Sequence, residues 1–123
     1  MAFHAPIPIL RIFDEAKARQ FYVDFLGFRV DFEHRFEPDA PLYMGVSLGD
    51  CKLNLSEHHG DASPGSTVRI RVDELEAYHQ SLLAKRYKYY RPGLADTDWH
   101  TREMTVQDGF GNKLVFYRDL PRP

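Results

Sequence analysis

The chain has 123 residues, enough for a single domain (1–123) with its own hydrophobic core, and it carries a formal net charge of −2 and one cysteine, Cys51. One cysteine excludes an internal disulfide, and the dispersed Lys and Arg residues argue against a nucleic-acid partner, because phosphate contacts need a clustered basic surface. No apolar run reaches the roughly 18 residues of a membrane span, and the first residues lack a signal-peptide pattern, so we expect a cytoplasmic protein without a membrane partner.

The N-terminal residues predict a strand followed by a helix. The apolar run 7–12 contains Pro8, which suits an edge strand because proline donates no ladder hydrogen bond. Asp14 suits the N-cap of a helix, and Gly27 suits its end. Between them, four residues recur at the spacing of one helical face: Ala18, Phe21, Tyr22 and Phe25.

Three strands are predicted next. Alternation places Phe28, Val30 and Phe32 on one apolar face of a strand, and the charged segment 33–40 follows as a loop. Two further alternating runs flank Gly49-Asp50, as is typical of a β-hairpin, and the lone cysteine is expected to pack within the second run. The first half of the chain therefore predicts the order β-α-β-β-β.

The second half repeats this order after a turn-rich linker, residues 57–65. The alternating run 68–72 predicts a strand, and Asp73 is expected to open a helix. The apolar face of this helix combines Leu75, Tyr78, His79 and Leu82. The tyrosines of segment 87–90 suggest another strand, residues 92–98 suggest a loop, and a glycine turn predicts a final hairpin that begins near Trp99.

The two β-α openings are about 60 residues apart, which indicates an internal repeat. We expect two βαβββ modules, at about residues 5–56 and 66–118, in an α+β fold. Neither module can bury its sheet alone, so the two are expected to pair.

Several short motifs resemble the glyoxalase, bleomycin-resistance and dioxygenase superfamily (the vicinal oxygen chelate superfamily). These motifs are Asp14, Phe21-Tyr22, Leu26-Gly27-Phe28, Val72-Asp73-Glu74-Leu75, Trp99-His100-Thr101-Arg102-Glu103 and Asp108-Gly109-Phe110-Gly111-Asn112. Within the superfamily the chain is most similar to the bleomycin-resistance proteins. The resemblance implies paired βαβββ modules, a domain-swapped or edge-paired homodimer, and ligand crevices at the junction of the two subunits.

Enzymes of this superfamily hold a metal between the first and last strands of each module. The corresponding positions of this chain are Ile7, Ser66 or Thr67, one of Leu53, Asn54 and Leu55, and Val115. A divalent metal needs several converging His, carboxylate or similar donors. No imidazole or carboxylate stands at these positions, so the sequence predicts no catalytic residue, metal or cofactor.

A metal-dependent lyase, isomerase or dioxygenase remains the alternative. It would use His4 and Glu103, together with a loop histidine such as His58 or His59. Adjacent histidines in a polar loop are mostly solvated. Because a metal is the usual charge stabiliser of such reactions, the sequence favours binding over turnover.

Aromatic side chains are the main candidates for the walls of a binding crevice. By resemblance, Trp99 and Phe32 are the best placed, and Tyr43 is a third candidate. Rings of this kind bury flat ligand surface and stack on it. Phe32 has a competing interpretation as a core residue of an alternating strand.

Polar candidates surround these rings. Ser56 and Arg102 stand where the superfamily has crevice-lining polar residues, and Asp31 would supply negative charge to a cationic ligand tail. A structural role for Arg102, paired with Glu103 or Asp108, is equally compatible with the sequence.

One position departs from the familiar resistance proteins, because Arg69 replaces a tryptophan. Arg69 and Arg71 share one strand face, and two cations disfavour a cationic ligand. We therefore expect a non-catalytic homodimer that sequesters a bleomycin-like glycopeptide or a related flat small molecule, anionic and neutral ligands included. A structural or partner-binding dimer is the third hypothesis.

Overall fold

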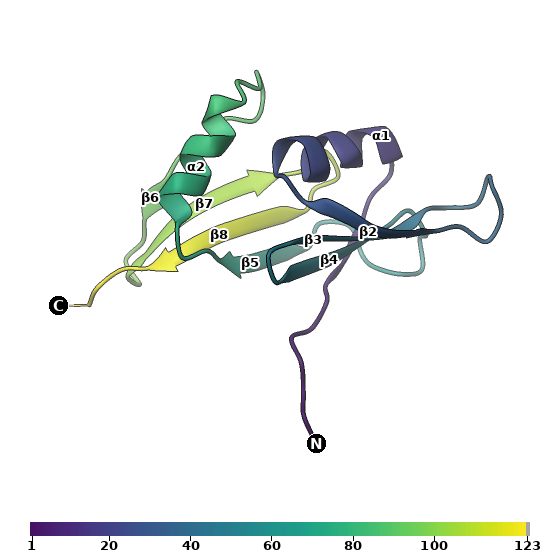
Figure 1. Cartoon of the computed structure of the whole chain (residues 1–123), viewed down its shortest axis with the longest axis horizontal. Coiled ribbons are helices and arrows are strands. Elements are labelled where there is room, and N and C mark those ends of the chain that lie inside the picture. The colour runs from purple at the N-terminus through teal and green to yellow at the C-terminus, as the bar shows by residue number, and fades with distance from the viewer. Residues whose placement is uncertain (123) are drawn as a thin grey trace.

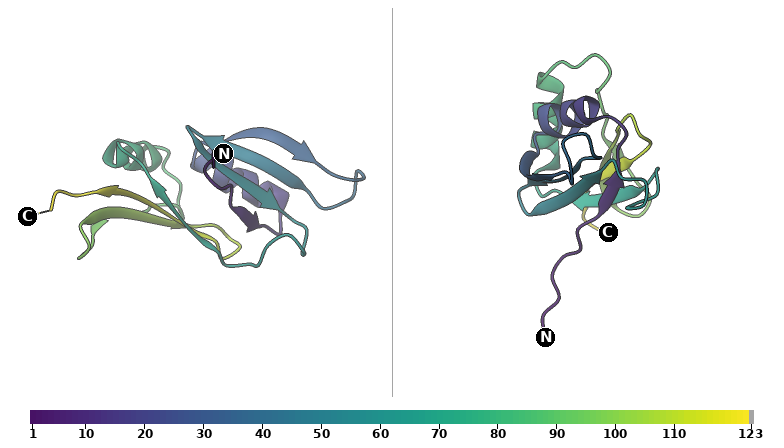
Figure 2. Two further views of the ribbon diagram at one scale, coloured as in Figure 1. Left: turned by 90° about the horizontal axis from the view of Figure 1, so that it is seen from below. Right: turned by 90° about the vertical axis from the view of Figure 1, so that its right-hand side faces the viewer.

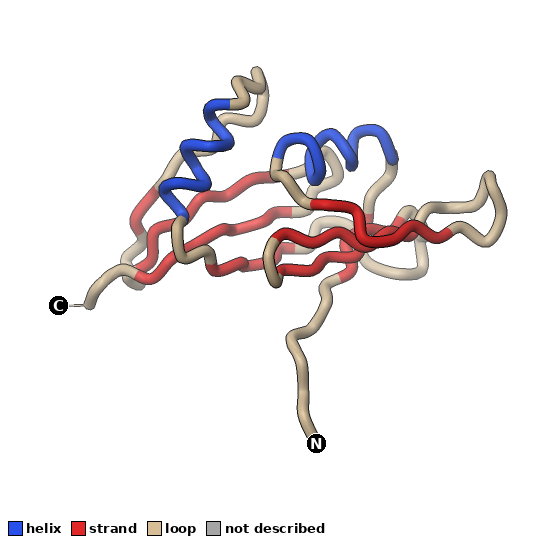
Figure 3. Tube along the Cα trace, in the orientation of Figure 1, coloured by secondary structure: helices blue, strands red, loops and turns tan. Residues whose placement is uncertain are grey.

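The computed structural model describes residues 1–122 and contains two four-stranded sheets with helices on one side (Figures 1 and 3). The first module consists of β1 (Ile9–Arg11), α1 (Glu15–Ala18), the π-helical segment η1 (Arg19–Phe25), β2 (Arg29–His34), β3 (Tyr43–Leu48) and β4 (Cys51–Ser56). The second module consists of β5 (Thr67–Arg71), α2 (Leu75–Ala84), β6 (Ala95–Asp96), β7 (Thr101–Gln107) and β8 (Lys113–Asp119). The predicted α+β fold of two βαβββ modules is confirmed.

The two sheets have the same topology. Their strand orders are β1-β4-β3-β2 and β5-β8-β7-β6. In each sheet the first strand of the module pairs in parallel with the last strand, whereas the other neighbours are antiparallel. The internal repeat seen in the sequence is therefore a repeat of strand pairing as well.

The first helix forms where the spacing predicts it. The Asp14 carboxylate accepts a hydrogen bond from the backbone N–H of Lys17 at 2.9 Å, which caps the helix. Gly27 ends it with φ +90°, a conformation that side chains disfavour. The four residues of the predicted apolar face are all buried: Ala18, Phe21, Tyr22 and Phe25.

Both helices lie on the same side of the two sheets, which leaves the opposite sides uncovered (Figures 1 and 2). We call these sides the helix face and the open face. The helix face of each sheet holds the core, to which alternate residues of the central strands contribute: Met44, Val46, Leu53, Leu55, Met104, Leu114 and Phe116. The residues between them point to the open face, because successive side chains of a strand alternate.

A β-bulge in β2 changes the predicted alternation. The pairing with β3 shifts between Val30 and Phe32, with Asp31 as the extra residue. Val30 stays on the helix face opposite Val46, but Phe32 lies opposite Gly45 on the open face and is 46% exposed. The expectation that Phe28, Val30 and Phe32 share one face is therefore wrong for Phe32.

Three further expectations in the second module are corrected. Segment 87–90 is not a strand, because the rings of Tyr87 and Tyr90 pack on Phe25, at 5.3 and 4.9 Å between ring centroids. The third strand of the module is instead the two-residue β6, within the expected loop. The helix begins at Leu75 after Glu74, one residue later than an N-cap at Asp73 would give.

Buried hydrogen bonds join the turn between β7 and β8 to the first module. The Tyr22 hydroxyl donates to Asp108 Oδ2 at 2.6 Å. The Asn112 amide donates to the same carboxylate oxygen at 2.9 Å and to the backbone carbonyl of Arg11 at 2.7 Å. Asp108, Asn112 and Tyr22 are all buried, so this network is a fixed link between the modules.

Residues 1–8 contain no helix or strand, and this segment leads away from the body on the side opposite the helices (Figure 1). Its Phe3 side chain is 89% exposed. Of the helices within residues 1–122, none combines the length and apolar character needed to cross a bilayer.

Candidate functional site

Two stacked rings lie on the open face of the first module. The centroids of Phe32 and Tyr43 are 6.2 Å apart, and the ring planes are inclined by 22°. Phe32 covers Gly45, where a Cβ atom would overlap the ring. The Tyr43 hydroxyl accepts a hydrogen bond from Asn54 Nδ2 at 3.0 Å, which fixes the second ring. The result is a preorganised and partly exposed aromatic surface.

Two polar candidates of the first module neighbour these rings, Asp31 in sequence and Ser56 in the sheet register. Asp31 accepts a hydrogen bond from Arg29 Nε at 3.0 Å, so its charge is already paired. Ser56 is buried and donates to Asp61 Oδ2 at 2.6 Å, under the segment that links the modules. Ser56 also lies next to Tyr43 in the sheet register.

Arg11 is a candidate that the sequence interpretation did not include. It pairs with Ser56 in the β1–β4 register, and only 6% of the residue is exposed. Its guanidinium lies 4.4 Å from the centroid of the Phe13 ring, and its Nη1 is buried without a hydrogen-bond partner among residues 1–122. The sequence does contain a signal for Arg11, because it stands between Leu10 and Ile12. When two apolar neighbours are buried in the core, the residue between them points to the other face of the strand.

The open face of the second module carries a connected polar and aromatic cluster around Glu103. Its carboxylate Oε2 accepts hydrogen bonds from Thr101 Oγ1 at 2.8 Å and from Trp99 Nε1 at 3.2 Å, and it pairs with Arg69 Nη2 at 2.9 Å. The Arg69 guanidinium also lies 4.3 Å from the centroid of the Tyr117 ring. Trp99 is 59% exposed, so its ring is held in place but open to a ligand.

Glu103 is ionised in this cluster. Burial alone would raise its pKa, but the hydrogen bonds from Arg69, Thr101 and Trp99 outweigh burial and hold the pKa of Glu103 below its ordinary value. The carboxylate therefore neutralises Arg69 and offers little free negative charge to a ligand.

Arg102 lies on the other side of β7, on the helix face. Its guanidinium binds Asp96 at 2.7 Å and Glu76 of α2 at 2.8 Å. Arg102 is thus part of an ion-pair network, which agrees with the prediction of a structural role for this residue. Its partners, however, are Asp96 and Glu76 rather than Glu103 or Asp108.

The structure separates the remaining candidates into two groups. Asp31, Phe32, Tyr43 and Ser56 belong to the first module, and the rings of this group lie where β2 ends and β3 begins. Trp99 precedes β7 by two residues. The β2–β3 loop and the start of β7 lie at opposite ends of the molecule (Figure 1). Within one chain, therefore, the stacked rings and Trp99 do not line one pocket.

The superfamily's metal does not fit the residues of one chain. The register places Ile9, rather than Ile7, opposite Asn54, and it places Arg69, rather than Thr67, opposite Val115. None of these four residues is an imidazole or carboxylate. In the described part of the chain, no three His, Cys, Asp or Glu side chains converge.

Two βαβββ modules with the same sheet topology define the fold of this protein, and the sequence comparison identifies its family. The model of the family described as "Glyoxalase superfamily protein" matches residues 1–120. The chain belongs to the glyoxalase superfamily. No curated protein matches the sequence.

Solved structures share the fold at low sequence identity. A bleomycin resistance determinant encoded on the transposon Tn5 is 21% identical, with a TM-score of 0.72 and coverage of 95% of this chain and 98% of the other. A bleomycin-binding protein complexed with bleomycin is 21% identical, with a TM-score of 0.70 and coverage of 95% and 99%. The antibiotic-binding protein TnmS3 from Streptomyces sp. CB03234 is 20% identical, with a TM-score of 0.69 and coverage of 97% and 98%.

Proposed function

We propose that the chain forms a cytoplasmic homodimer that binds a flat small molecule without chemical turnover. The ligand is a bleomycin-like glycopeptide or a related flat compound, held in a crevice at the dimer interface. The observation that carries this proposal is the exposed, preorganised Phe32–Tyr43 stack on an open sheet face. A large exposed aromatic surface is costly unless a ligand or another protein surface covers it.

The proposed dimer would bring the two separated candidate groups together. Phe32 and Tyr43 lie at the end of β2 and the start of β3. The start of β7, which Trp99 precedes by two residues, lies at the opposite end of the molecule. One ligand can contact both groups if the first module of one subunit faces the second module of its partner. A symmetric pair then forms two equivalent crevices, since an isologous interface presents each patch twice.

The charges of the open face favour a neutral or anionic ligand over a cationic one. The candidate carboxylates, Asp31 and Glu103, are paired with Arg29 and Arg69. Arg11 is a largely buried guanidinium without an ion-pair partner within residues 1–122, so its positive charge also favours an anionic ligand on this face. We therefore propose ligand contacts with Phe32 and Tyr43 from one subunit, and with Trp99 and Arg69 from the other. Asp31 and the buried side chains of Ser56 and Arg11 border the site.

Titration followed by Trp99 fluorescence tests the proposal, because Trp99 is the only tryptophan. Two probes are used, bleomycin and the flat anion anthraquinone-2-carboxylate. We expect saturable quenching by at least one probe, and about tenfold weaker binding after Phe32→Ala, from the loss of about 1.4 kcal/mol of stacking and burial.

The matched control is Phe36→Ala, which removes another exposed ring, in the loop beyond β2. This variant should bind like the unmodified protein. Failure of both probes to quench Trp99, or an equal loss in the two variants, would contradict the proposal.

A further inference from the structure

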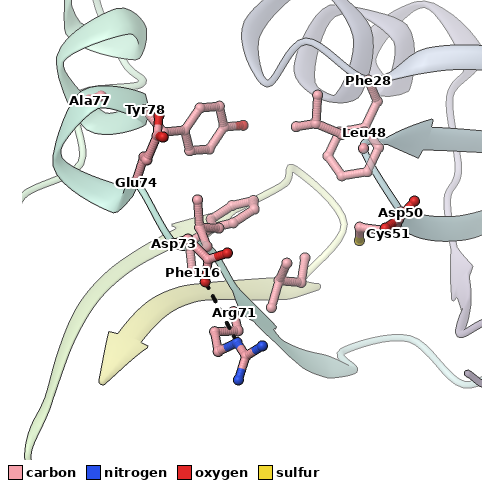
Figure 4. A pocket seen from close by; sticks show the side chains of 13 residues that line it. Phe28, Leu48, Asp50, Cys51, Arg71, Asp73, Glu74, Ala77, Tyr78 and Phe116 are labelled. Atoms are coloured by element: carbon pink, nitrogen blue, oxygen red, sulfur yellow. Dashed lines mark ion pairs between the residues drawn. The ribbon is translucent and has the colours of Figure 1, made fainter. Parts of the chain in front are cut away.

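A second concave site lies between the two modules, beside the β3–β4 turn and the start of α2. It is a groove of about 630 Å³, within the usual range of about 300–1,000 Å³ for small-molecule sites. Tyr78 of α2 faces Phe28 and Leu48 of the first module across it, and Phe116 lies at its base (Figure 4). The apolar lining residues include Phe28, Leu48, Cys51, Ile70, Tyr78 and Phe116.

The groove is distinct from the crevice proposed above. The rings of Phe116 and Phe28 belong to the core on the helix face, whereas the stack of Phe32 and Tyr43 lies on the open face. Leu48 and Tyr78 are only half-buried, so the groove leaves part of its apolar wall uncovered.

The rim of the groove is acidic. It carries three carboxylates, Asp50, Asp73 and Glu74, and one cation, Arg71. Arg71 Nε lies 3.9 Å from Asp73, whereas Asp50 and Glu74 have no ion-pair partner within residues 1–122. The start of α2 offsets about half a charge. The rim is therefore negative overall, in contrast to the paired carboxylates of the open face.

We propose that this groove binds an amphiphilic cation: a drug-sized molecule with an apolar body and a protonated amine. The body would lie on Leu48, Ile70 and Tyr78. The amine would lie at the rim, in the negative field of Asp50 on one wall and of Asp73 and Glu74 on the other (Figure 4). Charge next to an apolar wall interacts more strongly than charge in open water, which gives the rim its selectivity.

Cys51 supplies a specific readout, because it is the only cysteine and lines the groove. Its half-buried thiol has a pKa raised by burial, so it reacts slowly and protection is easily measured. We expect 4-phenylbutylamine to slow alkylation of Cys51 by iodoacetamide in a saturable manner, by about tenfold at about ten times its Kd. The anion 4-phenylbutyrate and the neutral 4-phenylbutanol should protect less.

The variant Asp50→Asn/Glu74→Gln removes two rim charges without changing shape, and the Glu74 side chain makes no capping hydrogen bond. It should weaken protection by the amine about three- to tenfold and bring it to the level of the neutral alcohol. The control Glu37→Gln/Asp39→Asn removes two exposed charges from the β2–β3 loop and should change nothing.

Equal protection by the amine and the carboxylate, or an unchanged amine affinity in the rim variant, would overturn the proposal. So would a Cys51 that is inert in the native protein but reactive in urea, since the groove would then be closed to small molecules. Trp99 fluorescence reports on the open face and not on the groove. Failure of the groove proposal can therefore be distinguished from failure of the crevice proposal.

Discussion

At the scale of single residues, the aromatic surface of the open face depends on a glycine. Gly45 lies directly under the Phe32 ring, so the ring approaches the sheet closely and stacks on Tyr43. Any side chain at residue 45 has to displace this ring. The position thus links the backbone of β3 to the shape of the proposed crevice.

We predict that Gly45→Ala weakens ligand binding more than it weakens the fold. The added methyl group displaces Phe32, whose exposed ring can swing away, so the free energy of unfolding should change by less than about 1 kcal/mol. Affinity for the quenching ligand should fall about tenfold, as in Phe32→Ala. Urea unfolding and Trp99 titration measure the two effects; loss of stability without loss of affinity would count against this role of Gly45.

Single residues also mark what the sequence could not show. Simple alternation would place Phe32 on the same sheet face as Val30. The bulge at Asp31 turns the Phe32 ring to the open face instead. A bulge depends on the pairing of two strands, which no local pattern specifies. The same reasoning applies to Arg102, whose partners Glu76 and Asp96 come from other elements.

At the scale of elements, α2 is tied to its sheet by one carboxylate. Glu76 binds Arg102 of β7 at 2.8 Å and Arg118 of β8 at 2.6 Å. The Arg118 guanidinium, with help from Arg102, lowers the pKa of Glu76 to about 2. The ionised side chain is therefore the form that stabilises the docking of the helix.

The sign of this shift gives a pH prediction. A lowered folded-state pKa stabilises the protein above the ordinary value of 4.5, and the contribution is lost as pH falls towards about 2. Glu76→Gln should lower the melting temperature at pH 7, and the difference from the unmodified protein should shrink below pH 4.5. Glu74→Gln, which removes an unpaired carboxylate near the same helix, is the control. A difference that stays constant down to pH 2 would contradict this account.

Elements with strong local signals were predictable from the sequence. The capped first helix and the hairpin at Gly49 follow from spacing and turn chemistry, and both are present. The structure of segment 87–90 was not predictable in this way. The β-propensity of its tyrosines is overridden by the packing of the Tyr87 and Tyr90 rings on Phe25. The two-residue β6 is too short to leave a pattern.

At the scale of the whole molecule, the hydrogen-bond network around Asp108 links the two modules. We propose that residues 1–123 unfold as a single domain for this reason. Tyr22→Phe removes the 2.6 Å hydrogen bond to Asp108 and leaves this buried carboxylate with one donor fewer. The free energy of unfolding should fall by about 1–3 kcal/mol.

Two probes in different modules test this cooperativity. Trp99 fluorescence follows the second module and Cys51 accessibility follows the first. Their urea transitions should coincide in the unmodified protein and shift together in Tyr22→Phe. Separate transitions would show that the modules are independent domains.

The central claim is that one crevice combines Phe32 of one subunit with Trp99 of the other, and mixed dimers test it most directly. Phe32→Ala and Trp99→Phe chains are unfolded together, refolded and titrated with anthraquinone-2-carboxylate. Each variant alone has two defective crevices, whereas a mixed dimer has one intact crevice and one with both changes. We predict that mixing restores tight binding at one site per mixed dimer, with quenching of the remaining Trp99. A mixture that binds no better than its two components would contradict a crevice shared between subunits.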